Sequence, residues 1–143
     1  MVFADWEAVG VWALSTLAHS GNGSARATGT VGIQRLQHKT FSSSRVYISM
    51  WAWAKLGTEG YITGMNHESY GDLSTTTNHS VWEFVEVWYW YDADSNTRWG
   101  RIYLNDVQVG GDTNFGLGAP AAGYIQLIAG KYNHYIDDVE VWA

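Results

Sequence analysis

The sequence predicts an all-β protein: a two-sheet antiparallel β-sandwich of the jelly-roll type. Three observations predict it. Apolar and polar residues alternate with a period of two, clusters of turn residues separate the segments, and no segment has helical periodicity. The 143 residues suit one ordinary domain, so we expect a single β-sandwich domain over residues 1–143.

In the first half of the chain, the turn residues 19–23 precede an expected strand over 24–36, and a longer strand follows over 45–55. Apolar residues alternate with aromatic ones in this longer strand. Its expected core face carries Val46, Ile48, Met50 and Ala52. Its opposite face carries Tyr47, Ser49, Trp51, Trp53 and Lys55. Residues 63–80 are rich in polar side chains, and we expect a long loop there, of a length that is often functional.

In the second half, the segment 82–91 is the other clear strand. Its expected core face carries Glu83, Val85, Val87 and Tyr89, and its opposite face carries Trp82, Phe84, Glu86, Trp88 and Trp90. A tight turn at Asn105–Asp106 joins expected strands over 98–104 and 107–109. A Gly- and Ala-rich loop with the single proline, Pro120, follows, and strands over 124–129 and 135–142 end the chain.

Composition excludes several functional classes. The net charge is −6 with no basic stripe, so the chain is a poor partner for nucleic acid or an anionic membrane. Without cysteine it forms no disulfide, zinc–thiolate site or cysteine nucleophile. No apolar run approaches the roughly 20 residues that span a bilayer. No leader follows Met1, so we expect a fragment of a larger, extracellular or secreted polypeptide.

Aromatic content points to a binding surface. Nine Trp and nine Tyr exceed what a core of this size absorbs, and exposed aromatic residues in numbers mark contact surfaces. Flat aromatic rings stack on the apolar faces of sugars, while nearby polar groups bind the hydroxyls. The expected polysaccharide-binding residues are Trp51, Trp53, Trp88, Trp90, Tyr103, Arg101, Glu86 and Gln126. Two alternatives stay open: some of these Trp belong to the core, or the surface binds protein.

Three segments carry a resemblance to a known family. They are residues 3–7 with Trp12 and the turn 19–25, the middle stretch 82–92 with 101–106, and the closing stretch Tyr135-Ile-Asp-Asp-Val-Glu-Val-Trp142. Together they resemble jelly-roll carbohydrate-binding modules and the concanavalin A-like and laminin-G-like domains. Asp106 stands where those domains have glycine. The fold also hosts lectins, glycosidases, lyases and viral coat proteins, so it does not by itself fix the function.

The resemblance further implies a structural calcium ion at one edge of the sandwich. Calcium takes six to eight oxygen ligands at about 2.3–2.6 Å, and an inward-facing Asp137 is costly unless it is paired or metal-bound. The implied ligands are Asp5, Glu7, Ser20, Asn22 and Asp137, with Ser24 as a further candidate. Alternatively, Asp137 caps a turn or pairs with an arginine.

We assign no catalytic residue from the sequence. Glu83 and Glu86 lie three residues apart in a strand and face opposite sides, so they cannot form the carboxylate pair of a glycosidase. Residues 129–134 resemble loosely the Lys-x-Gly-x-Tyr-Asn-Gln stretch of alginate lyases. A polysaccharide lyase with Tyr132 or Tyr103 paired to His67 or His79 therefore remains an alternative. A viral, phage or adhesion module is another.

Overall fold

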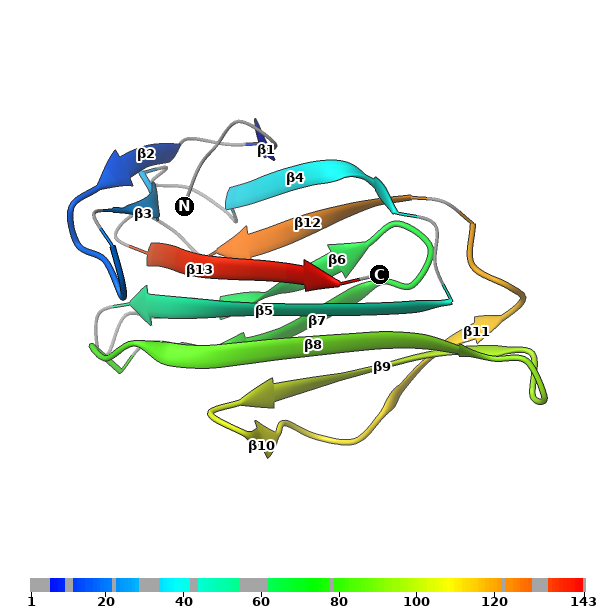
Figure 1. Ribbon diagram of the computed structural model, residues 1–143. Helices are drawn as coiled ribbons and strands as arrows, with labels where there is room; N and C mark the ends of the chain where they lie inside the picture. The colour runs from blue at the N-terminus through cyan, green and yellow to red at the C-terminus, as the bar shows by residue number, and fades with distance from the viewer. Residues whose placement is uncertain are drawn as a thin grey trace.

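The structure is a computed structural model that describes residues 6–9, 12–21, 23–28, 34–41, 44–54, 62–77, 79–121, 123–129 and 134–142. Within these ranges thirteen strands form two antiparallel sheets that pack face to face (Figure 1). The expected all-β sandwich is therefore confirmed. The described residues contain no helix with the length and apolar character needed to cross a membrane.

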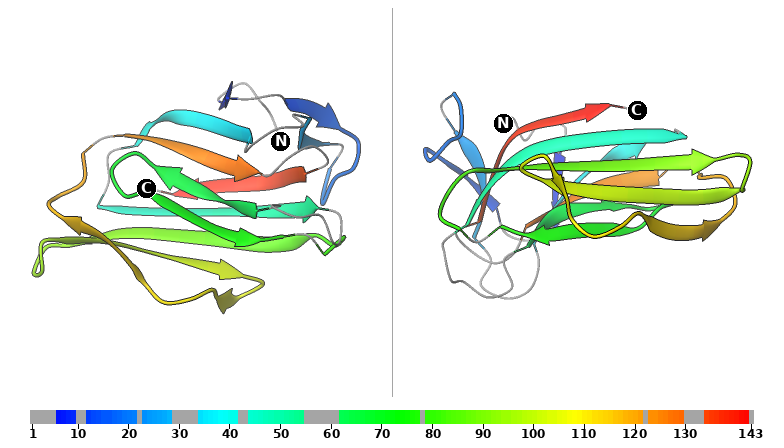
Figure 2. Two further views of the ribbon diagram at one scale, coloured as in Figure 1. Left: turned by 180° about the vertical axis from the view of Figure 1, so that it is seen from behind. Right: turned by 90° about the horizontal axis from the view of Figure 1, so that it is seen from below.

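One sheet has five strands in the order β1-β4-β12-β6-β7. Their bounds are β1 (Trp6–Val9), β4 (Gln34–Phe41), β12 (Gly123–Ala129), β6 (Ile62–His67) and β7 (Asp72–Thr76). This sheet lies behind the other in Figure 1 and faces the reader in the left view of Figure 2.

The other sheet has eight strands in the order β10-β9-β8-β5-β13-β3-β2, with β11 paired to β9. The central strands are β9 (Thr97–Leu104), β8 (Glu83–Asp92), β5 (Arg45–Ala54) and β13 (His134–Trp142). The outer strands are β10 (Val107–Gln108), β11 (Thr113–Leu117), β3 (Ser24–Ala27) and β2 (Trp12–Ser15).

The core lies between the sheets and confirms the two expected core faces. On the inner faces of β5 and β8, the side chains of Val46, Ile48, Met50, Ala52, Glu83, Val85, Val87 and Tyr89 are buried. They meet Met65, Ile125 and Leu127 of the five-stranded sheet, which are also fully buried. The buried Tyr89 hydroxyl contacts the carbonyls of Met65 at 3.2 Å and Gly71 at 2.8 Å, so its polar atom is satisfied.

The expected loop over residues 63–80 is wrong, because most of it forms the hairpin of β6 and β7. The inward positions of this hairpin include Thr63, His67 and Thr75, all buried. These polar residues hide the apolar alternation that would have predicted a strand. Thr63 has a hydrogen-bonding partner in Thr77 at 2.6 Å, which makes its burial tolerable.

Other segment boundaries also differ from expectation. The expected single strand over 24–36 is divided between β3 of the eight-stranded sheet and β4 of the five-stranded sheet. The Gly- and Ala-rich loop contains β11. The hairpin turn at Asn105–Asp106 is confirmed, and both residues have positive φ, 49° and 68°, as a type I′ turn requires.

Candidate functional site

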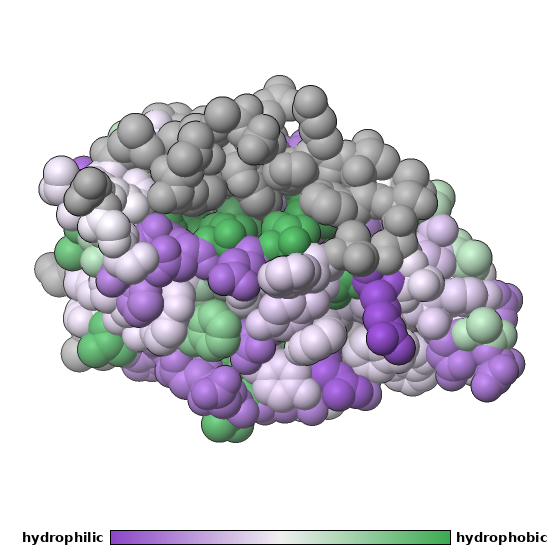
Figure 3. Space-filling view, viewed as in Figure 1, coloured by the Kyte–Doolittle hydropathy of each residue, from purple (hydrophilic) through white to green (hydrophobic). Residues whose placement is uncertain are grey.

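The outer surface of β13, β5, β8 and β9 gathers the aromatic side chains, and we name it the aromatic face. Residues directly opposite each other on neighbouring strands share a face, so the register defines its members. Its aromatic residues are Trp142, Tyr135, Tyr47, Trp51, Trp53, Phe84, Trp88, Trp90, Trp99 and Tyr103. Figure 3 views the molecule from this side, where most of the described surface is pale or purple.

One row of side chains crosses the aromatic face from β13 to β9. The register pairs Trp142 with Tyr47, Tyr47 with Trp88, and Trp88 with Arg101. The Tyr47 and Trp88 rings lie 4.3 Å apart between centroids. Trp142 is 63% exposed and Trp88 is 41% exposed, so both present ring surface to solvent. Exposed indoles of this kind are unusual outside contact surfaces.

Tyr47 is fixed by a neighbouring carboxylate. Its hydroxyl donates a hydrogen bond of 2.6 Å to Glu86 Oε2 on the next strand. Burial, followed by this hydrogen bond, raises the pKa of Tyr47 to about 12. The phenol therefore remains a neutral donor at any physiological pH, and it holds the Glu86 carboxylate in place on the face.

Two adjoining grooves, each of about 510 Å³, open on the aromatic face. The first groove is lined by Arg45, Glu86, Trp88, Tyr89, Trp90, Arg101, Tyr103 and Asp106. The second groove is lined by Tyr47, Ser49, Trp51, Phe84, Asp138, Val139 and Glu140. Both combine aromatic rings with a few polar groups, which is the usual composition of a small-ligand site.

Two of the four predicted tryptophan platforms are already covered by other side chains. The Arg101 guanidinium lies 4.6 Å from the Trp90 ring centroid and is held there by Asp112 at 2.9 Å. The His19 ring stacks on Trp51, with centroids 3.9 Å apart. Among the four, Trp88 is the one that is exposed. The structure thus brings all four tryptophans to one face, with Trp88 as its open platform.

Trp53, Glu86 and Tyr103 also lie on the aromatic face, whereas Gln126 does not. Gln126 belongs to β12 of the five-stranded sheet, so its expected place beside the tryptophans is wrong. Its amide accepts from Arg35 Nη1 at 3.1 Å and donates to Gln37 Oε1 at 2.9 Å. The sequence shows that Gln126 is polar and lies in a strand, but it does not show which of the two sheets this strand joins.

The expected calcium edge is only partly assembled by the described residues. Asp137 and Ser20 lie together: Asp137 Oδ2 accepts the backbone N–H of His19 at 2.9 Å and of Ser20 at 3.2 Å. Glu7 lies on β1 of the five-stranded sheet, opposite Gln37. Asp5 and Asn22 lie outside the described residues.

The donors around Asp137 suit a carboxylate without a metal. Besides the two N–H groups on Oδ2, the N–H of Asp138 donates to Oδ1 at 2.8 Å. Such donors satisfy a buried carboxylate and occupy the oxygens that a cation would need. No group of three His, Cys, Asp or Glu side chains that could hold a metal ion occurs among the residues that the structure describes. The described part of this edge therefore forms a hydrogen-bonded turn around Asp137.

The expected inward orientation of Asp137 is wrong because β13 contains a bulge. The register shifts between Asp137 and Glu140, and Asp138 adopts a left-handed φ of 48°. Asp137 is opposite Trp51 and Trp142 is opposite Tyr47, so both belong to the outer side. Asp137 is nevertheless buried, because the turn at residues 19–20 covers it.

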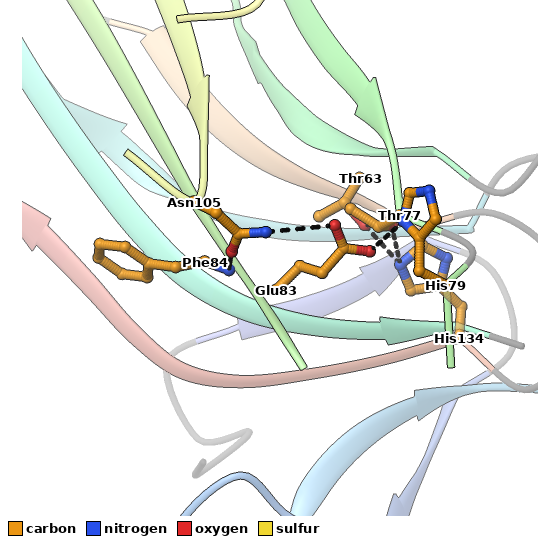
Figure 4. A network of polar contacts seen from close by, with 7 residues as sticks. All are labelled: Thr63, Thr77, His79, Glu83, Phe84, Asn105 and His134. Carbon is orange, nitrogen blue, oxygen red and sulfur yellow. Dashed lines mark hydrogen bonds and ion pairs between the residues drawn. The ribbon is translucent and has the colours of Figure 1, made fainter. Parts of the chain in front are cut away.

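A polar network closes one end of the sandwich (Figure 4). His134 Nε2 lies 2.5 Å from Thr63 Oγ1, and burial lowers the pKa of His134 to about 3. The inward Glu83 carboxylate contacts His79 Nδ1 at 2.6 Å and Asn105 Nδ2 at 3.5 Å. These partners explain how Glu83 and His134 are tolerated inside the sandwich.

The structure does not bring together His67 and Tyr103, one of the acid–base pairs considered for a lyase. His67 is buried on the inner side of β6, and burial lowers its pKa. Tyr103 lies on the aromatic face of the other sheet. Glu83 and Glu86 face opposite sides of β8, as expected. Lys55 and Tyr132 lie outside the described residues.

Several residues of this face were missed from the sequence: Arg45, Tyr47, Trp99, Asp106, Asp112, His19, Glu140 and Trp142. The alternation in β5 predicted that Tyr47 lies on the same side of the strand as Trp51 and Trp53, but Tyr47 was not among the expected polysaccharide-binding residues. Trp142 was hidden, because the bulge at Asp138 reverses the alternation after it. His19 carries no local signal, since its partner Trp51 is distant in the sequence.

No family model matches the chain, and no curated protein matches it by sequence. Solved structures match its fold. The chain is similar to the cellulose-induced protein Cip1, with a TM-score of 0.67, 13% identity, and coverage of 99% of this chain and 93% of that one. It is also similar to the exoplasmic/lumenal domain of VIP36 in its Ca²⁺/Man3GlcNAc-bound form, with a TM-score of 0.60, 11% identity, and coverage of 99% and 84%.

A third similar structure is the endo-β-1,4-glucuronan lyase of the fungus Trichoderma reesei, with a TM-score of 0.59, 10% identity, and coverage of 93% of this chain and 87% of that one. A sialidase also matches, but the chain spans only 17% of its length. At these identities the similarity concerns the fold alone. It confirms the expected jelly-roll sandwich fold.

Proposed function

We propose that the chain is a non-catalytic carbohydrate-binding domain that binds polysaccharide through its aromatic face. The observation that carries this proposal is the open Trp88 indole in the first groove, with Glu86, Arg101 and Tyr103 beside it. An indole face contributes apolar contact to a sugar ring, and the surrounding groups offer hydrogen bonds in fixed positions. The similar structures include an endo-β-1,4-glucuronan lyase and a VIP36 domain with Man3GlcNAc bound.

The polar groups of the first groove are held in fixed positions, which supports its role as a binding site. Tyr47 holds Glu86 at 2.6 Å, and Asp112 holds Arg101 at 2.9 Å. Side chains that are ordered before the ligand arrives lose little conformational entropy on binding. The first groove is therefore preorganised for a polar ligand with an apolar face.

Affinity electrophoresis and isothermal titration with soluble glucans, xylans and mannans test the proposal. We expect at least one of these polysaccharides to bind, and we expect Trp88→Ala to abolish binding without a change in melting temperature. Leu117→Ala is the matched control, because Leu117 is 72% exposed and lines neither groove. If no polysaccharide binds and the protein forms a large stable oligomer, a viral or adhesion role replaces this proposal.

A second candidate function is a polysaccharide lyase on the outer side of the five-stranded sheet. The observation that favours it is the polar row formed by Arg35, Gln126 and Gln37, with Asn66 opposite Gln126 on β6. An arginine and amides are able to bind the carboxylate of a uronic acid. Release of unsaturated sugars, followed by ultraviolet absorbance, from glucuronan or alginate would support this activity, and Arg35→Ala should then abolish it.

The proposal also includes a structural calcium ion and an extracellular location. The similar VIP36 structure is described as Ca²⁺-bound, and two of the expected ligands, Ser20 and Asp137, lie together at this edge. A calcium ion here would also need Asp5 or Asn22. Melting curves with and without a chelator test it: a lower midpoint in chelator supports the ion, and an unchanged midpoint with no metal by elemental analysis removes it.

A further inference from the structure

We propose that the ligand is an extended, uncharged polysaccharide chain that runs across the strands and occupies both grooves of the aromatic face. This inference rests on the proposed function, because it concerns the ligand of the same face. Three properties of the face support it: the continuity of the two grooves, the direction of the exposed aromatic row, and the charge of the second groove.

The two grooves are continuous because their walls meet across neighbouring strands. Tyr47 and Ser49 of the second groove lie directly opposite Trp88 and Glu86 of the first. Directly opposite residues have Cβ atoms only about 5 Å apart. The hydrogen-bonded pair of Tyr47, from the second groove, and Glu86, from the first, lies between the grooves. A chain that leaves one groove therefore enters the other without crossing a further element.

The exposed aromatic row gives the direction of the chain. Trp142, Tyr47 and Trp88 stand on the adjacent strands β13, β5 and β8. Two strand spacings amount to about 10 Å, which is about the length of two sugar residues in an extended chain. Because the row is perpendicular to the strands, a sugar chain that stacks on Trp142 and Trp88 runs across the sheet. Such a chain passes over Trp88 of the first groove and Tyr47 of the second.

The charge of the second groove selects against acidic sugars. Asp138 and Glu140 line it, and none of its described lining residues is lysine or arginine. A polyuronate would place its carboxylates next to Asp138 and Glu140, where like charges repel.

The first groove does not compensate for this repulsion. Its two arginines, Arg45 and Arg101, are balanced by Glu86 and Asp106. Arg101 is in addition paired with Asp112 at 2.9 Å, with 35% of each side chain exposed. The described residues that line the two grooves therefore offer hydrogen bonds and ring surfaces but no net positive charge, which suits a neutral sugar chain.

Isothermal titration with oligosaccharides of increasing length tests the inference. Neutral disaccharides and hexasaccharides of the polysaccharide that binds are compared with oligouronates of equal length. We expect the neutral hexasaccharide to bind at least about tenfold more tightly than the neutral disaccharide. We expect each oligouronate to bind more weakly than the neutral oligosaccharide of the same length. Trp142→Ala should weaken hexasaccharide binding and leave disaccharide binding unchanged, whereas Leu117→Ala should change neither.

A charge variant tests the second groove separately. Glu140→Gln keeps the hydrogen-bonding side chain and removes its charge, so the affinity for the oligouronate should rise severalfold relative to the affinity for the neutral hexasaccharide. If disaccharide and hexasaccharide bind equally and Trp142→Ala has no effect, the occupation of both grooves is wrong but the proposed function stands. If oligouronates bind more tightly than neutral chains, the charge selection is wrong. If no oligosaccharide or polysaccharide binds, the proposed function itself fails.

Discussion

The imidazole of His19 lies parallel to the indole of Trp51, with ring centroids 3.9 Å apart and planes inclined by 10°. Two contacts hold it there: its Nδ1 lies 2.7 Å from Asp138 Oδ2, and its backbone N–H donates to Asp137. Phe84 packs beside Trp51 with centroids 5.1 Å apart. Trp51 therefore contributes to the structure of this edge, whereas Trp88 remains open.

Trp51→Ala and Trp88→Ala should have opposite effects. Trp51→Ala removes the surface on which His19 stacks, so we expect the free energy of unfolding to fall by about 2 kcal/mol. Binding of a disaccharide to the first groove should persist. Trp88→Ala should abolish that binding and leave stability nearly unchanged. Urea denaturation and titration on the same samples measure both, and the reverse pattern would show that Trp51 is the open platform.

Tyr47→Phe should remove a phenol whose pKa is raised and should leave the Glu86 carboxylate without its hydrogen bond from Tyr47. The folded pKa of Tyr47 is about 12, above its usual value of 10, so its contribution to stability is complete below pH 10 and is lost as the pH rises towards 12. The stability difference between the wild type and Tyr47→Phe should therefore shrink over this interval. Ultraviolet titration of tyrosine ionisation provides the check. A variant that titrates like the wild type would contradict the assignment.

Asp106→Gly should stabilise the β9–β10 hairpin. Asp106 has a φ of 68°, a conformation that glycine adopts without steric cost, so we expect a gain of about 0.5 kcal/mol. Asn105→Gly is the matched control. Asn105 also has positive φ, but its Oδ1 accepts the Phe84 N–H at 2.9 Å, and the loss of this bond should make the variant less stable. Equal shifts in melting temperature for both variants would refute this account.

Protonation of His134 should destabilise the protein in acid. Its pKa falls from 6.5 to about 3 on folding, so the unfolded chain binds the proton more readily between these values. Stability is complete above pH 6.5 and is lost as the pH falls, by roughly 2–3 kcal/mol at pH 4.5. His134→Gln should show a flatter dependence of the unfolding free energy on pH. Parallel curves for the two proteins would exclude this residue as the cause.

Alternation predicted the parts of the fold that have apolar inner faces. It identified β5 and β8 and the face on which each carries its tryptophans, because a period of two is decisive where one side is aliphatic. It failed for β6 and β7, whose inner sides carry Thr63, His67 and Thr75. Thr63 lies within hydrogen-bonding distance of Thr77 and of His134 on β13, and such partners are not visible in a single segment of sequence.

The sequence predicted most of the residues of the candidate site, but it predicted only part of their spatial arrangement. Most of the selected residues lie on the aromatic face, since they belong to strands that pair directly. Gln126 lies on the other sheet, because strand order is a property of the whole fold. Stacking of His19 on Trp51 and of Arg101 on Trp90 decides which rings are open, and these contacts join residues that the chain brings together only on folding.

The single extra residue in β13 makes this strand sensitive to changes in length. Upstream of Asp138 the strand places Ile136 in the core, and downstream of it Val141 returns to the core side while Trp142 faces out. In a strand of the same length without the bulge, these last two side chains would exchange sides, leaving an indole to be packed between the sheets and a valine in the binding row. Deletion of the one extra residue would instead restore regular pairing and keep both side chains on their present sides. Natural relatives of this chain should therefore keep the bulge or be one residue shorter at this position.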